Sequence, residues 1–184
     1  MSHLLANVND QNTASIATEI KQIKFGESQF YSFLESFFNF AVSENESSSS
    51  GAYAQLAKEL ENFVVSFSTS TRVLFSDELI GWLHLAMDNI TTYTDKVFAV
   101  SKRMVATTSF IGNLYNVGFL TPRLLRHWMS NLSSLKNKTL AEILARSVKQ
   151  KVQQDLKTVK KNATLISIME LISELKIVDT AENG

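Results

Sequence analysis

The sharpest constraint on the fold is the segment 110–129, whose sequence is typical of the inner elbow of a helical hairpin. One amphipathic helix ends near Gly118, and Thr121 offers a side-chain oxygen to cap the next one. Pro122, the only proline of the chain, stands at the first helical position, where its missing N–H costs nothing. An apolar stripe with intervals of 3, 4 and 3 residues follows at once, formed by Leu125, Trp128, Leu132 and Leu135. The segment therefore predicts two helices joined by a tight turn.

The same helical spacing of apolar residues recurs along most of the chain. It predicts a short helix from Thr13 or Ser15 that Gly26 interrupts, and a helix capped by Ser76 that ends at a break over 91–94. A further helix follows this break and ends at about Val117. The remaining predicted helices cover 27–42, 52–67, 122–135, 139–159 and 164–177, with a low-complexity loop at 43–51 and a Ser/Thr-rich connection at 66–72. No run of alternating polar and apolar residues predicts a strand.

Seven or eight amphipathic helices joined by short polar turns predict an all-α domain. Their lengths favour antiparallel hairpins, which stack into an α-solenoid when each hairpin buries its apolar face against its neighbours. Exact internal repeats are not visible, so a compact bundle stays open as the alternative. We expect a flexible N-terminus over 1–12, a single helical-repeat domain over 13–177 and a flexible acidic tail over 178–184.

The composition fits one globular domain and removes several classes of site. Of the 184 residues, 45% are hydrophobic and 20% charged, which supplies enough apolar material for a core. The absence of Cys removes disulfides and cysteine metal sites. No apolar run reaches the roughly 18 residues that span a bilayer, and residues 1–11 do not resemble a secretory signal. We therefore expect a cytoplasmic protein without a membrane span.

The formal net charge of zero hides a strong segregation along the chain. Residues 1–101 carry five Lys/Arg against twelve Asp/Glu, a net charge of −7, and residues 162–184 carry one against four, a net charge of −3. Residues 102–161 carry twelve basic residues against two acidic ones, a net charge of +10. Such asymmetry within one domain indicates surfaces for charged partners.

Ten residues of this basic segment are candidate RNA-binding or partner-binding residues. Arg146, Lys149, Gln153, Lys157 and Lys160 have intervals of 3, 4, 4 and 3, which predicts one solvated helical stripe. The ten candidates are Lys102, Arg103, Arg123, Arg126, Lys136, Lys138, Arg146, Lys149, Lys157 and Lys160. On successive helices of one stack they would merge into a positive face. Such a face attracts phosphates by counterion release, or docks an acidic protein surface. An ordinary solvated surface is the third interpretation.

Three pieces of the chain resemble one known family of helical scaffold domains. Phe-Ile-Gly-Asn-Leu-Tyr at 110–115, followed by Phe-Leu-Thr at 119–121, is similar to a diagnostic segment of the MIF4G family, the middle domain of the large scaffold subunit of the cap-binding translation initiation complex. The first hairpin of the family is similar to 37–44 followed by Ala-Tyr-Ala at 52–54, and a helix that closes on Asp-Leu is similar to 142–156. The resemblance covers about 29–157. Asn113 stands where the family has Glu, which favours a divergent member, for example in a translational regulator of the Mextli type.

The resemblance implies stacked HEAT-like hairpins, with a DEAD-box RNA helicase or a translation initiation factor as partner. It carries no specific contact residues over to this chain. The leading hypothesis is a non-enzymatic scaffold in translation initiation or mRNA regulation that binds protein partners and, through its basic face, RNA. The alternative is a general protein–protein adaptor or oligomerisation bundle unrelated to RNA. A weaker third hypothesis is a peripheral adaptor on anionic membranes.

Neither catalysis nor metal binding has support in the sequence. His3, His84 and His127 show no metal-ligand spacing, and the six glycines form no phosphate-binding loop. We therefore expect no enzyme, no cofactor and no metal.

Trp82 and Trp128 fit core positions better than stacking platforms for bases. Gly112, in the middle of a predicted helix, indicates the close approach of a neighbouring helix.

Overall fold

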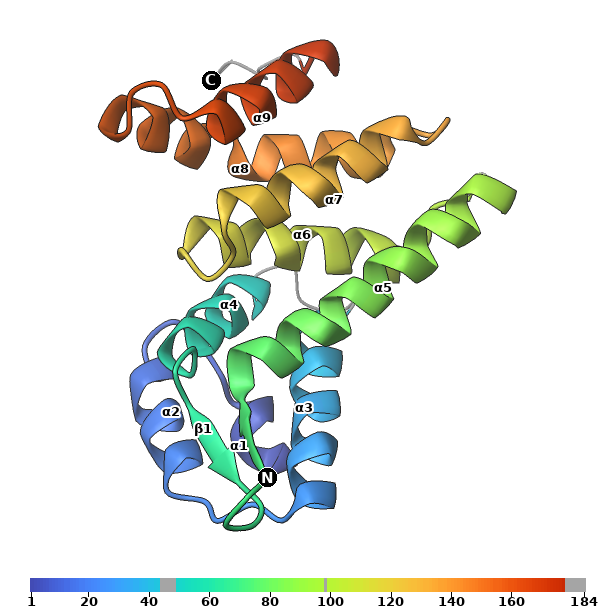
Figure 1. The fold of residues 1–184 in the computed structure, drawn as a ribbon. Coiled ribbons are helices and arrows are strands. Elements are labelled where there is room, and N and C mark those ends of the chain that lie inside the picture. Colours follow the sequence, from blue (N-terminus) through green and yellow to red (C-terminus); the bar gives the residue numbers. More distant parts are fainter. Residues whose placement is uncertain (44–48, 98, 178–184) are drawn as a thin grey trace.

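The computed structural model describes residues 1–43, 49–97 and 99–177 (Figure 1). Within these ranges the chain forms nine α-helices and one small sheet, so the prediction of a mainly helical protein is confirmed. The helices are α1 (Ser2–Ala6), α2 (Thr13–Lys21), α3 (Glu27–Ala41), α4 (Ser49–Glu59), α5 (Phe75–Val97), α6 (Lys102–Asn116), α7 (Pro122–Ser134), α8 (Thr139–Thr158) and α9 (Ala163–Glu174). The strands β1 (Val64–Ser66) and β2 (Arg72–Leu74) pair between α4 and α5.

Alternate helices pack on one another along the length of the molecule. Helix α2 packs on α4, α4 on α6 and α6 on α8, while α7 packs on α9. Consecutive helices also touch, as α3 does with α4 and α8 with α9. The molecule is therefore elongated, with α1 to α3 at one extremity and α9 at the other (Figure 1).

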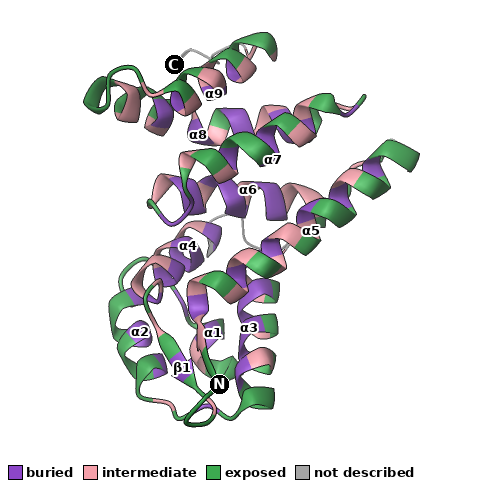
Figure 2. Cartoon of the chain, viewed as in Figure 1, coloured by how far each residue is buried: buried purple, intermediate pink, exposed green. Residues whose placement is uncertain are grey.

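Aromatic side chains dominate the core of the N-terminal half. The rings of Phe33 and Phe37 on α3 both lie against Phe75, which opens α5, with centroids 6.3 and 5.5 Å apart. Phe37 also lies 6.5 Å from Phe110 on α6, so the aromatic cluster extends into the C-terminal half. The buried positions follow the inner side of each helix (Figure 2). Regular apolar stripes thus position the helices, as their spacing predicts.

The N-terminal segment differs from our expectation of a flexible tail over 1–12. Leu5 is fully buried and Val8 is also part of the core. Helix α1 packs on α3, and the Tyr53 hydroxyl donates a hydrogen bond to the Leu5 carbonyl. One buried leucine within α1 and a buried valine two residues after the helix are enough to anchor this segment on the neighbouring core.

The helix predicted over 52–67 is too long, and the prediction of no strand is wrong here. Helix α4 ends at Glu59, and Val65 of β1 pairs with Val73 of β2 in an antiparallel register. The Phe67 N–H donates to the Thr71 carbonyl at 3.0 Å, which closes the hairpin. β-branched residues suit such strands, but three-residue strands are too short to show alternation in a sequence. Phe63 and Phe67 are four residues apart, a spacing that is also typical of one face of a helix, so the predicted helix extended too far.

The break predicted over 91–94 is also wrong, because α5 continues to Val97. The Thr91 hydroxyl donates to the Met87 carbonyl at 3.0 Å, one helical turn earlier. Thr94 is buried, and its hydroxyl lies 3.7 Å from the Met104 sulfur. Threonine favours breaks because its hydroxyl competes for backbone groups, and here the helix itself accommodates that hydroxyl.

Two predicted loose segments lie wholly or largely outside the described residues. Of the low-complexity loop at 43–51, residues 44–48 are not described, and α4 begins at Ser49, earlier than predicted. The acidic tail at 178–184 is not described either. The interruption at Gly26 is confirmed, since Gly26 is the N-cap of α3.

Candidate binding surfaces

The elbow between α6 and α7 has the local structure that its sequence predicts. Helix α6 ends at Asn116, and Gly118 adopts a positive φ of 77°, a conformation that glycine takes without steric cost. Thr121 is the N-cap of α7, and its hydroxyl accepts a hydrogen bond from the Leu124 N–H at 3.3 Å. Pro122 is the first helical residue. The chain therefore reverses within a few residues, and the start of α7 has a defined position.

A polar cluster fastens this elbow to the neighbouring helices. The Tyr115 hydroxyl donates to Asp155 Oδ2 on α8 at 2.9 Å, and Lys151 forms an ion pair with Asp155 Oδ1 at 2.8 Å. Lys58 on α4 donates to the Gly118 carbonyl at 3.1 Å. Burial, and secondly the hydrogen bond to Asp155, raises the pKa of Tyr115 above its ordinary value. These groups satisfy one another, so their role is structural.

The residues that carry the family resemblance are almost all core residues. Phe110, Ile111, Leu114 and Tyr115 are buried, and Gly112 faces Ser147 of α8. Asn113, where the family has Glu, donates from Nδ2 to the Ser50 hydroxyl on α4 at 2.7 Å. The motif therefore specifies helix packing.

The ten candidate basic residues are spread over both ends of the C-terminal helices and along α8. Gly112 on α6 faces Ser147 on α8, and Tyr115 bonds Asp155, so α6 and α8 run in the same direction. A 20-residue helix such as α8 is about 30 Å long. Residues near the starts of α6 and α8 are therefore far from residues near their ends. The candidates therefore lie in two end groups joined by the stripe of α8, and one merged positive face stays a prediction.

One group lies at the start of α6 and in the turn between α7 and α8. It consists of Lys102, Arg103, Lys136 and Lys138. Arg103 donates to Asn39 Oδ1 on α3 at 2.8 Å, and its guanidinium lies 5.9 Å from the Phe38 ring centroid. Lys138 donates to the Ser133 carbonyl in its own turn.

The other group lies at the elbow end, on the first turns of α7 and around the turn from α8 to α9. It consists of Arg123, Arg126, Lys157 and Lys160. Arg126 Nε donates to the Ser167 hydroxyl on α9 at 2.7 Å, so α7 and α9 are joined on this side. Arg146 is exposed and Lys149 half-buried along the middle of α8, where Gln153 continues the exposed stripe.

A hollow of about 570 Å³ opens on α7 within the elbow-end group. Its polar lining includes Arg123, Arg126 and His127, and all three side chains are exposed. No carboxylate of the described residues forms an ion pair with either arginine. The sequence indicated both arginines as candidates but did not single out His127.

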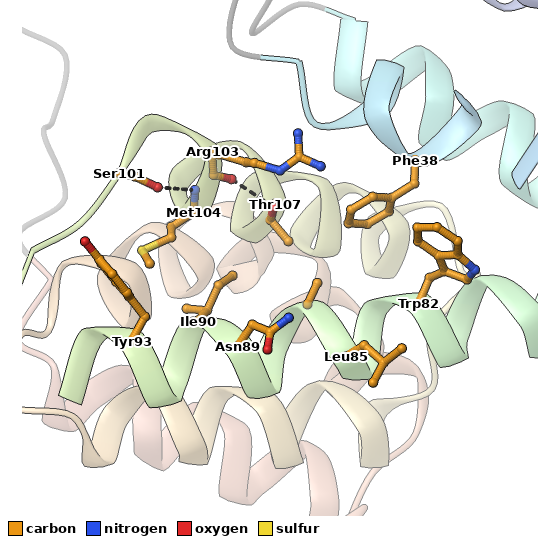
Figure 3. Close-up of a pocket in the computed structure, with 11 residues that line it drawn as sticks. Phe38, Trp82, Leu85, Asn89, Ile90, Tyr93, Ser101, Arg103, Met104 and Thr107 are labelled. Atoms are coloured by element: carbon orange, nitrogen blue, oxygen red, sulfur yellow. Dashed lines mark hydrogen bonds between the residues drawn. The ribbon is translucent and has the colours of Figure 1, made fainter. Parts of the chain in front are cut away.

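A second hollow, of about 520 Å³, lies between α3, α5 and α6 (Figure 3). We call it the α5 cleft. Its lining is mostly apolar and consists of Phe38, Trp82, Leu85, Ala86, Asn89, Ile90, Tyr93, Ser101, Arg103, Met104 and Thr107. Sequence reasoning missed this cleft. The only signal was that Leu85 and Tyr93 lie off the inward stripe of Leu79, Leu83 and Met87.

The described residues contain no cluster of three or more His, Cys, Asp or Glu side chains able to hold a metal ion. The rings of His84 and Trp128 form a T-shaped pair with centroids 5.1 Å apart, which gives this histidine a packing role. Trp128 itself is buried, as its stripe predicts. Among the described residues, each helix is too short or too polar to cross a membrane.

Neither the comparison with protein-family models nor the search of curated proteins returned a match to this chain.

Proposed function

We propose that this chain is a non-enzymatic scaffold of the MIF4G type that acts in translation initiation or mRNA regulation. Three observations support the proposal. Alternate helices pack in succession, as stacked HEAT-like hairpins would. The motif at 110–121 forms the packed elbow of that stack. The positive charge of the chain is concentrated on its C-terminal helices.

The elbow-end group is the RNA-binding surface in this proposal. The observation that carries it is the pair Arg123 and Arg126, which line one hollow and have no carboxylate partner among the described residues. Guanidinium groups bind phosphate oxygens through paired N–H donors, and neighbouring hydroxyl groups add further donors. Lys157 and Lys160 lie at the same end and extend the positive potential. Such a surface binds the RNA backbone with little sequence preference.

Direct titration of RNA tests the proposal. A fluorescein-labelled oligouridine should bind the chain with an affinity that falls as salt increases. Arg123→Glu/Arg126→Glu should weaken binding and lower the slope of log K against log salt by about 0.7 per lost phosphate contact. Arg123→Glu alone is informative as well, because Arg123 forms no hydrogen bond with any described residue, whereas Arg126 holds Ser167.

The matched control is Lys21→Glu/Lys24→Glu, which changes the net charge equally on two exposed residues near α2. It should leave RNA binding nearly unchanged. Unaltered RNA binding by the arginine variant, or an equal loss in the lysine variant, would contradict the proposal.

A protein–protein adaptor without RNA is the second candidate, and the α5 cleft is the observation that favours it. An apolar hollow with exposed apolar residues at its rim, here Leu85 and Tyr93, is typical of a partner site. Affinity purification with and without nuclease separates the two candidates. Partners that persist after nuclease treatment, and include no helicase or initiation factor, would favour the adaptor.

A further inference from the structure

The α5 cleft is apolar at both ends (Figure 3). Phe38 and Trp82 stand at one end, with ring centroids 5.9 Å apart, and Tyr93 and Met104 stand at the other. Ile90 is buried beneath the cleft. The floor and ends therefore supply the apolar contact area on which protein–protein recognition depends.

The length of the cleft and its exposed rim residues fit a helix better than a small molecule. Trp82 and Tyr93 are eleven residues apart on one helix, which at about 1.5 Å per residue gives a groove about 16 Å long. About three turns of a second helix have this length. Leu85 and Tyr93 are 66% and 47% exposed, although both residues are large and apolar. A small ligand confined to the cleft would leave Leu85 and Tyr93 exposed to water.

The polar groups of the cleft indicate the charge of the partner. The hydroxyl groups of Ser101 and Thr107 already have intramolecular hydrogen bonds, to the Met104 N–H and the Arg103 carbonyl. The Arg103 guanidinium donates to the neutral Asn39, and none of the described carboxylates forms an ion pair with it. Asn89, on the opposite wall, has no hydrogen bond with a described residue. A carboxylate entering between them gains a charge-assisted bond.

We infer that the α5 cleft binds an amphipathic helix of a partner protein. The partner places large apolar side chains at positions i, i+4 and i+7 against Trp82, Leu85 and Tyr93, and one Asp or Glu against Arg103. This site is separate from the proposed RNA surface, because the cleft lies on α3, α5 and α6, whereas the arginine hollow lies on α7. The inference therefore does not depend on RNA binding.

Selection from a phage-displayed library of helical peptides tests this inference. The full chain is the bait, and the library randomises the helix positions among apolar, charged and polar residues. The selected peptides should have large apolar residues at i, i+4 and i+7 together with an Asp or Glu. A synthetic copy of the best peptide then serves as the probe in fluorescence anisotropy. Replacing its acidic residue with Gln or Asn should weaken binding about tenfold, as the loss of a hydrogen bond between charged groups does.

Variants of the chain locate the binding site. Leu85→Glu and Tyr93→Glu should each weaken binding at least about tenfold, because they place charge against apolar anchors. Ile166→Glu is the matched control, since Ile166 is 43% exposed on α9 and lies outside the cleft. Arg103→Glu should reverse the preference, so that a peptide with Lys at the acidic position binds better. Thermal denaturation of each variant verifies folding.

Three outcomes would overturn the inference. The first is a selection that yields no helical binder, and the second is a set of binders that Leu85→Glu and Tyr93→Glu do not affect. A third is concentration-dependent dimerisation that Leu85→Glu abolishes, which would assign the cleft to a second copy of the chain. RNA binding by Leu85→Glu should remain at the wild-type level, so failure here is distinguishable from failure of the proposed function.

Discussion

Gly112 on α6 lies so close to Ser147 on α8 that a Cβ atom on the glycine would stand 2.2 Å from the serine Oγ and 2.7 Å from its Cβ. Both distances are shorter than a van der Waals contact. Asn116, one turn further along α6, donates from Nδ2 to the Ser147 carbonyl at 2.9 Å. The pair therefore sets how closely these two parallel helices approach, and the prediction of close packing at Gly112 is confirmed.

We expect Gly112→Ala to lower the free energy of unfolding by about 1–3 kcal/mol, the usual cost of overpacking. The change adds a methyl group where α6 and α8 already touch, which outweighs the better helix propensity of alanine. Urea denaturation followed by circular dichroism measures the effect. The double variant Gly112→Ala/Ser147→Gly removes both clashing atoms and should recover part of the loss.

Gly81→Ala is the matched control for this substitution. Gly81 also lies within a helix, but a Cβ atom there meets nothing within 4 Å. We expect this variant to be more stable than wild type by about 0.5–1 kcal/mol, because alanine replaces glycine in an exposed helix. A neutral Gly112→Ala would contradict the close contact.

Thr121→Ala should lower the free energy of unfolding by about 1 kcal/mol, since it removes the side-chain cap of α7. Thr121→Ser retains the hydroxyl and should keep most of the stability. The two variants are compared by thermal denaturation. If serine were as damaging as alanine, the methyl group of Thr121, and not its hydroxyl, would be the stabilising feature.

Tyr115→Phe should lower the free energy of unfolding by about 1 kcal/mol at neutral pH, because it removes the hydrogen bond to Asp155. The pKa of Tyr115 is raised above its ordinary value of about 10 in the folded chain. Its contribution is thus fully present below pH 10 and declines as the pH rises further, because the unfolded chain ionises first. Tyr115→Phe should therefore lose less stability above pH 10 than wild type.

Measurements of unfolding between neutral and strongly alkaline pH test this expectation. Tyr93→Phe is the control, since Tyr93 is exposed on α5. It should follow the wild-type pH profile. Identical alkaline profiles for Tyr115→Phe and wild type would show that Tyr115 does not carry the effect.

Leu5→Ala should lower the free energy of unfolding by about 2–5 kcal/mol, the usual range for a buried leucine. The reason is that Leu5 lies fully buried in α1, which packs on α3. His3→Ala, on the exposed side of the same helix, should change stability little. A small effect of Leu5→Ala would instead support the flexible N-terminus that the sequence predicts.

Local signals were sufficient for much of the helical structure and for part of the candidate site. The capping residue, the single proline and Gly118 act within one or two turns, so the elbow was predictable to the residue. The arginine pair was predictable too, because charge and helical spacing are properties of a short segment. The hairpin of β1 and β2 was not, since Val65 pairs with Val73 across a loop and leaves no periodic pattern.

Short stretches of the chain were sufficient to specify its amphipathic helices, the residues where several of them begin and end, and the concentration of positive charge between residues 102 and 161. These properties depend on neighbours within a few residues. Only the tertiary packing places eight of the ten candidate basic residues at two opposite ends, because the parallel packing of α6 on α8 separates the starts of these helices from their ends. It also decided that Leu85 and Tyr93 remain exposed beside Arg103. Whether an apolar side chain is covered depends on which distant helix packs against it, and no local pattern records that.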